Sequence, residues 1–203
     1  MGPSRVALLL ALAVTGISTA RASAAEWQFK PFLGATYGGS TTFLFVPQLQ
    51  SGAPAHLVFG GSGMFLGEFL GVEGDFGHTP SFFQDSSNPI QLIADSGVTT
   101  VTGNVVLAVP RHLVQYSLRP YIVGGAGVMH VGIDYVGNPI STSSTLKTMD
   151  LGAGVTGFLT KHLGVTWDVR YFRSIDRTIE TGQSIGSEHL SFWRANMAVA
   201  IRL

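Results

Sequence analysis

Cysteine is absent from this sequence, and charged residues are scarce. The 203 residues include 12 Lys and Arg against 12 Asp and Glu, so charged side chains make up 12% of the chain and the formal net charge is zero. The lack of cysteine excludes disulfides, thiolate metal sites and a cysteine nucleophile. The lack of a basic excess gives no reason to expect a nucleic-acid partner. Because soluble domains average about 25% charged residues, the composition is compatible with a surface that does not meet water.

Long apolar runs are missing too, since no segment reaches the roughly 18 consecutive apolar residues of a transmembrane helix. The shorter apolar run over 6–14 follows Arg5 and precedes the small residues at 22–24. A positive residue, an apolar run and a small-residue site, in that order, are typical of a cleaved secretory signal. The sequence therefore predicts a signal peptide over 1–25 and a single exported domain over 26–203.

The exported part alternates large apolar side chains with small or polar ones in segments of about ten residues. This period of two indicates β-strands with two different faces. We predict eight strands, over 27–37, 56–66, 69–77, 97–109, 119–134, 147–159, 163–173 and 190–203.

The connections between these strands alternate in length. The short ones are 66–69, 110–117 and 160–163, and the long polar ones are 38–55, 78–96, 135–146 and 174–189. Outer-membrane barrels have short periplasmic turns and long extracellular loops, and their strand number is even. The pattern therefore predicts an all-β fold, an eight-stranded antiparallel up-and-down transmembrane β-barrel.

Each predicted strand has one apolar face and one polar face. In the segment 163–173, Trp167, Val169 and Tyr171 alternate with Asp168 and Arg170. In a membrane barrel the apolar face meets lipid and the polar face lines the lumen. Aromatic residues near the ends of the apolar faces predict girdles at the two lipid interfaces. We place Trp27, Tyr37, Tyr121, Trp167, Tyr171 and Trp193 in these girdles.

The polar faces carry charges of both signs in equal number. The cations are Lys30, Arg170, Arg194 and Arg202, and the anions are Glu73, Asp75, Asp150 and Asp168. The interior of an eight-stranded barrel is just wide enough for side chains to fill, and buried charges are tolerated when they are paired. We therefore predict a packed lumen rather than an open pore. The candidates for its ion pairs are Glu73, Asp75, Asp168, Arg170 and Arg194. The alternative is that these charges lie on the wet surface of a soluble sheet.

Several strand motifs resemble those of a known family. Arg119-Pro120-Tyr121, followed by Gly124-Gly125-Ala126-Gly127, resembles a strand motif of the OmpA/OmpX-like outer membrane β-barrel proteins. The segments at 30–34, 151–155 and 169–171 fit other strands of that pattern. The resemblance implies the fold, residence in outer-membrane lipid after secretion, and assembly by the barrel-assembly machinery. It does not imply an activity.

Residues that could carry chemistry are few. The six histidines form no cluster at metal-ligand spacing, so we expect no metal and no cofactor. His189 and Ser191 resemble the His and Ser of outer-membrane lipid A deacylases, in which an acid completes a triad. Glu188 should point to the opposite face of the strand, and Glu180 lies in a loop of unknown path, so the pattern places no acid beside the pair. We therefore predict no enzyme, and a lipid-modifying enzyme stays the alternative.

The long connections carry apolar residues such as Phe43, Phe45, Phe82 and Phe83, which mark a contact site or cluster with each other. The sequence predicts an outer membrane barrel with a structural or surface-display and adhesive role, binding an extracellular ligand through its loops. Two further alternatives are a soluble periplasmic lipocalin-like binding barrel, with the two faces inverted, and a narrow channel.

Overall fold

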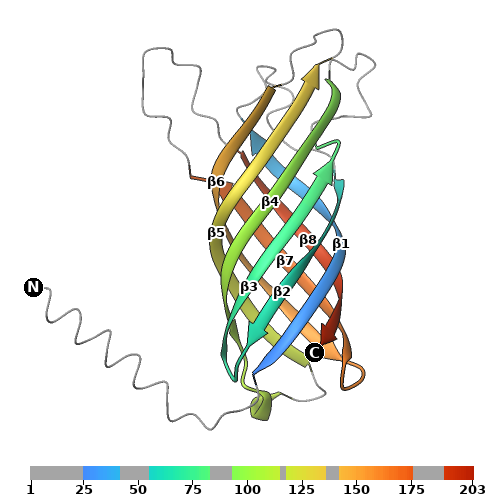
Figure 1. The fold of residues 1–203 in the computed structure, drawn as a ribbon, viewed down its shortest axis with the longest axis vertical. Helices are drawn as coiled ribbons and strands as arrows, with labels where there is room; N and C mark the ends of the chain where they lie inside the picture. Colours follow the sequence, from blue (N-terminus) through green and yellow to red (C-terminus); the bar gives the residue numbers. More distant parts are fainter. Residues whose placement is uncertain (1–24, 42–54, 83–92, 115–117, 136–141, 176–189) are drawn as a thin grey trace, which may run out of the picture.

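The computed structural model describes residues 25–41, 55–82, 93–114, 118–135, 142–175 and 190–203. Eight antiparallel strands follow each other around a closed barrel, and β1 pairs with β8 to complete it (Figure 1). This confirms the predicted all-β, up-and-down fold. The strands are β1 (Glu26–Thr41), β2 (His56–Leu66), β3 (Leu70–Pro80), β4 (Ile93–Ala108), β5 (Leu118–Tyr135), β6 (Thr142–Phe158), β7 (Leu163–Ser174) and β8 (Leu190–Arg202).

The two ends of the barrel differ. One end carries the tight β2–β3 and β6–β7 turns and the short connection between β4 and β5, which contains a 3-10 turn (Arg111–Leu113). β1 begins and β8 ends at this same end (Figure 1). Among the described residues, no helix has both the length and the apolar character needed to cross a membrane. The barrel therefore has a short-turn end and a long-connection end, as the sequence predicts.

Several strands run further toward the long-connection end than predicted. β2 has the predicted bounds, but β4 begins at Ile93 rather than 97 and β6 begins at Thr142 rather than 147. The added part of β6 reads Thr-Ser-Ser-Thr-Leu, and Leu146 is its one apolar residue. A segment with a single apolar residue gives no period-two signal, because alternation needs several apolar residues on one face.

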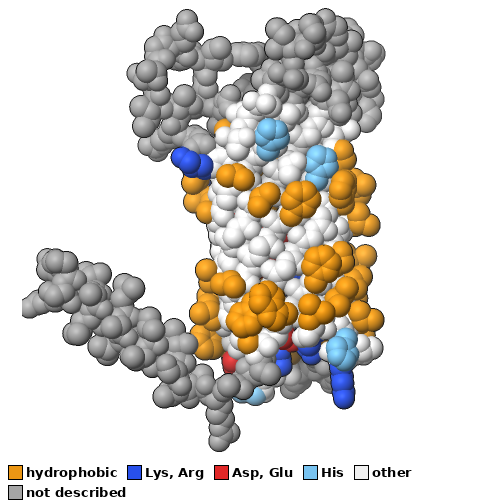
Figure 2. All heavy atoms as spheres, viewed as in Figure 1, with side chains coloured by type: hydrophobic (Ala, Val, Ile, Leu, Met, Phe, Trp, Pro, Cys, Tyr) orange, Lys and Arg blue, Asp and Glu red, His pale blue; other side chains and the backbone are white. Residues whose placement is uncertain are grey.

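The outer wall of the barrel is apolar, and most of the charged side chains of the strands point into its interior. Trp167 is 60% exposed, whereas Arg170 on the same strand is 2% exposed. Figure 2 shows apolar side chains in two bands across the face in view, and the cationic side chains in view lie toward the two ends. The exterior of a lipocalin-like soluble barrel would be charged, so the inverted alternative is wrong for the described residues.

Tyr121 corrects the predicted girdle. It is 6% exposed and points into the lumen, where its hydroxyl donates to Asp168 Oδ2 at 2.8 Å. The assignment to the outer face was wrong. β5 has small residues on both faces, so its sequence does not show which residues point outward. Arg119, two residues earlier, shares the inner face with Tyr121. Because residues two positions apart lie on the same face of a strand, this charged residue indicates which face of β5 points inward.

Candidate functional site

The centre of the lumen holds a network of charged side chains, which we call the central network. The structure brings the five candidate residues together there. Arg170 donates to Asp168 Oδ1 at 2.8 Å through Nε, and its Nη1 lies 2.7 Å from Glu73 Oε1. Arg194 Nη2 donates to Asp75 Oδ1 at 2.8 Å. All five side chains are buried, so each charge depends on its partners rather than on water.

The central network joins opposite walls of the barrel. Glu73 and Asp75 come from β3, whereas Arg170 comes from β7 and Arg194 from β8. Glu73 and Asp75 share one face of β3, as Asp168 and Arg170 share one face of β7, because the members of each pair are two positions apart. Lys30 on β1 adds a contact of 3.7 Å to Glu73 Oε2. The ion pairs therefore tie together strands that share no backbone ladder.

Rings and glycines define the space around the two guanidinium groups. The Arg194 guanidinium carbon lies 4.8 Å from the centre of the Phe32 ring and 4.7 Å from that of Phe172, which are cation–π distances. A Cβ at Gly77 would lie 2.5 Å from Arg194 Nη1, and one at Gly152 would lie 2.6 Å from Arg170 Cγ. The glycines thus leave the room that these arginines occupy.

The charge balance of the central network differs from the predicted one. Arg202 was counted among the lumen cations, but it lies at the barrel rim and pairs with Glu26. The central network therefore has the four predicted carboxylates against three cations. Asp150 has the weakest cation contact, 3.8 Å from Arg170 Nη1, and its Oδ2 lacks a hydrogen-bond partner. Asn104 supports it by donating to Oδ1 at 2.9 Å when its amide oxygen faces Arg170.

Apolar layers lie on both sides of the central network. The layer toward the long connections includes stacked Phe172 and Phe192, with ring centres 5.3 Å apart, and Phe82 at 5.2 Å from Phe192. The layer toward the short turns contains Met64, Leu66, Val106, Ala108, Tyr121 and Val123. Of the two readings left open for the apolar residues of the long connections, burial of Phe82 in the first layer speaks against an exposed contact site at that residue. Side chains thus fill the lumen above and below the charges.

A second charged cluster, missed by the sequence analysis, lies at the short-turn rim. The carboxylate of Glu26 binds Arg119 Nη1 at 3.1 Å and Arg111 Nη2 at 2.5 Å, and it also pairs with Arg202. Arg119 further donates to the backbone carbonyls of Gly67, Glu68 and Val109. One signal was available, because Glu26 shares its face with Gln28 and Lys30.

The residues considered for catalysis and metal binding are not assembled into a site. His189 lies outside the described residues, as do Phe43, Phe45 and Phe83, and Ser191 is buried. Within the described ranges, no three His, Asp or Glu side chains are grouped in a way that could hold a metal ion.

The comparisons with known proteins agree with this architecture. A family model described as the outer membrane protein beta-barrel domain matches residues 9–191. Neisserial surface protein A, from Neisseria, has a similar structure with a TM-score of 0.64 at 11% identity, over 87% of this chain and 97% of that chain. OprG of Pseudomonas aeruginosa has a TM-score of 0.54 at 12% identity, over 89% and 96%. The N-terminal barrel of OprF from the same organism has a TM-score of 0.51 at 13% identity, over 88% and 97%. No curated protein sequence matches significantly.

Proposed function

Because the chain belongs to the outer membrane protein β-barrel domain family, we propose that it acts as a closed, lipid-embedded scaffold with a structural or surface-display and adhesive role. Membership confirms the predicted location, the bacterial outer membrane, and with it the resemblance to OmpA-like barrels. The proposal includes removal of the signal over 1–25, leaving the barrel domain over 26–203, and delivery by the barrel-assembly machinery.

The observation that carries the proposal is the filled lumen. Arg170 lies 2.7 to 3.8 Å from four carboxylates that come from three strands. An aqueous channel would hydrate such charges separately, whereas a dry core requires them to be paired. Together with the apolar layers on either side, the pairing supports a rigid core rather than a path for solutes. Any contact with a partner then takes place at the two ends of the barrel.

The second part of the proposal concerns orientation. In bacterial barrels the short turns face the periplasm and the long loops face outward. We therefore place the β2–β3 and β6–β7 turns in the periplasm and the connections 42–54, 83–92, 136–141 and 176–189 outside the cell. Loops on a rigid scaffold are frequent binding sites, and one protein of similar fold is named as a surface protein. An extracellular ligand would bind here.

Epitope insertion in intact cells tests this orientation. A tag inserted within 136–141 should be labelled by antibody without permeabilisation, and the same tag inserted between Lys161 and His162, in the β6–β7 turn, should require permeabilisation. Labelling of the 160–163 turn in intact cells, with the 136–141 tag protected, would overturn the proposal.

We propose no catalytic step. The lipid-modifying alternative needs Ser191 to reach a lipid substrate, and burial of that side chain disfavours it. The substitution His189→Ala should leave the acylation of lipid A unchanged in intact cells, and loss of deacylation would revive the enzyme hypothesis.

A further inference from the structure

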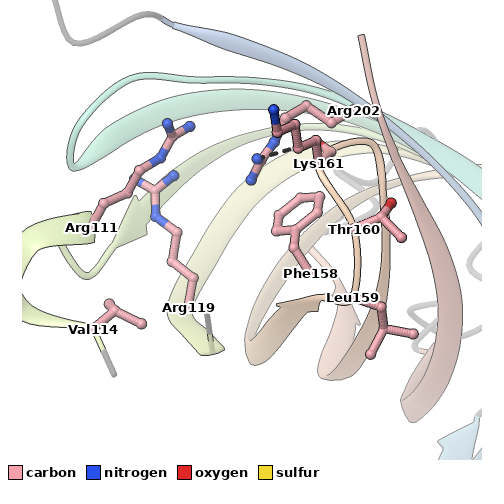
Figure 3. Close-up of a pocket in the computed structure, with 8 residues that line it drawn as sticks. All are labelled: Arg111, Val114, Arg119, Phe158, Leu159, Thr160, Lys161 and Arg202. Atoms are coloured by element: carbon pink, nitrogen blue, oxygen red, sulfur yellow. Dashed lines mark hydrogen bonds between the residues drawn. The ribbon is translucent and has the colours of Figure 1, made fainter. Parts of the chain in front are cut away.

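A cavity opens at the short-turn rim beside the second charged cluster. Its volume is about 540 Å³, and it is lined by Arg111, Val114, Arg119, Phe158, Leu159, Thr160, Lys161 and Arg202. Figure 3 shows Arg111 and Arg119 on one side, with Lys161 and Arg202 across from them and Phe158 between. Among the described residues, four cations and no acid line this cavity.

The charge at this rim is not balanced by its acids. Glu26 is shared by three of the four cations, and Glu68 at the same rim bonds His112 at 3.3 Å. Even when both acids are counted, four cations leave an excess of two positive charges. Within the described residues, Lys161 has no carboxylate at ion-pair distance. An anion entering the cavity would therefore gain attraction without displacing an existing pair.

The donors of the cavity suit a phosphate group. Arg111 is 40% exposed at its side chain and Arg202 is 27% exposed, so both guanidinium groups can reach a ligand while binding Glu26. Arginine offers planar pairs of N–H donors that match phosphate oxygens. The Thr160 hydroxyl oxygen accepts from the backbone N–H groups of His162 and Leu163, which leaves its own proton free to donate.

The apolar part of the cavity favours a lipid phosphate over a free one. Phe158 supports the guanidinium of Arg202, whose carbon lies 3.5 Å from the ring centre. Leu159 is 81% exposed and extends the outward-facing row of β6, with Leu151 and Met149, into the turn. The cations therefore lie next to the surface that meets hydrocarbon, at the end of the barrel where lipid headgroups lie.

We propose that this cavity binds the phosphate headgroup of an anionic phospholipid of the inner leaflet of the outer membrane. The inference rests on the orientation proposed above only for the choice of leaflet. The binding itself is a property of the cavity, and it can be measured in detergent, where the barrel has no leaflets. If the cavity binds no lipid, the proposed display of loops at the other end of the barrel still stands.

Native mass spectrometry of the refolded barrel in neutral detergent tests the proposal. The probes are phosphatidylglycerol, zwitterionic phosphatidylcholine and inorganic phosphate. We expect one phosphatidylglycerol to be retained, with about tenfold weaker binding in the variant Arg111→Ala with Lys161→Ala, because exposed charge contacts are individually modest. The matched control is Lys147→Ala with Arg173→Ala, which removes the same two charges from exposed positions toward the other end and should bind as the unmodified chain does.

The single variant Lys161→Glu guards against loss of folding, since this exposed turn residue makes no described side-chain contact. It should keep the fold and weaken binding as the double variant does. Equal retention of phosphatidylglycerol by all variants would overturn the proposed site. Equal retention of phosphatidylcholine, or displacement of the lipid by an equimolar amount of inorganic phosphate, would overturn the assignment to an anionic headgroup.

Discussion

Arg170 is the residue on which most of the central network depends. Its guanidinium lies 2.7 Å from Glu73 and 2.8 Å from Asp168, and within 3.8 Å of two further carboxylates. A buried ion pair adds little stability over an apolar pair of the same size, but a buried charge that loses its partner is very costly. The position therefore tolerates neither a neutral residue nor a shorter cation.

The substitution Arg170→Met tests this dependence. It keeps an unbranched apolar stem, removes the guanidinium and leaves four carboxylates with two cations, so the free energy of unfolding should fall by about 3–5 kcal/mol. Arg173→Met is the control, because Arg173 is exposed on the same strand, and should change it by less than about 0.5 kcal/mol. Urea titration of the barrel in phospholipid vesicles measures both. Equal stability of the two variants would show that the central network is hydrated.

The central network has more carboxylates than cations. We therefore predict that neutralising two of its acids changes the free energy of unfolding in opposite directions. Asp150→Asn should be neutral or stabilising by up to about 1 kcal/mol, because Asp150 has only a distant cation and an unsatisfied oxygen. Glu73→Gln should destabilise by about 2–3 kcal/mol, because Glu73 contacts both Arg170 and Lys30. The same urea titration compares them, and an equal loss for both variants would contradict the charge count.

At the scale of the strands, sequence reasoning succeeds where a strand has lipid on one face and the lumen on the other. β7 shows this alternation from Leu163 to Tyr171, and its position follows from it. The first residues of β6 are polar on both faces, so nothing in the pattern distinguishes them from a loop. Alternation thus predicts the part of each strand that crosses the membrane and not the part above it.

In the lumen, the face on which a residue lies can be predicted from the sequence, and its ion-pair partner cannot. That Glu73, Asp75 and Arg170 share the inner face follows from their parity along each strand. Which of them meet depends on the stagger between strands that are far apart in the chain. The rim cluster was missed because Glu26, Arg111 and Arg202 come from two strand ends and a turn, where no period applies.

Strand pairing around the network predicts a contrast between two glycines. A Cβ at Gly152 would lie 2.5 Å from the carbonyl oxygen of Val169 and 2.6 Å from Arg170 Cγ, whereas one at Gly74 would meet nothing within 4 Å. We expect Gly152→Ala to destabilise the barrel by about 1–3 kcal/mol through overpacking. Gly74→Ala should be neutral or stabilising by about 0.5 kcal/mol. The loss of the folded band in unboiled gel samples, followed over urea concentration, measures the difference.

For the whole molecule, the outer and inner faces of the sheet have different roles. The outer face is apolar and holds the barrel in lipid, while the inner face is closed by ion pairs between two apolar layers. Closing a sheet of eight strands removes its edges and leaves an interior that side chains can fill. The two ends are then free to differ, with the proposed display of loops at one end and the proposed phosphate site at the other.

Conductance in a planar lipid bilayer tests the closed lumen most directly. Purified, folded protein inserted from detergent should give no stepwise current in concentrated KCl, because Phe172, Phe192 and the Arg170 ion pairs occupy the middle of the lumen. Insertion is verified beforehand by the gel-mobility shift between unboiled and boiled samples. Stable unitary currents from the shifted, folded form would contradict the account.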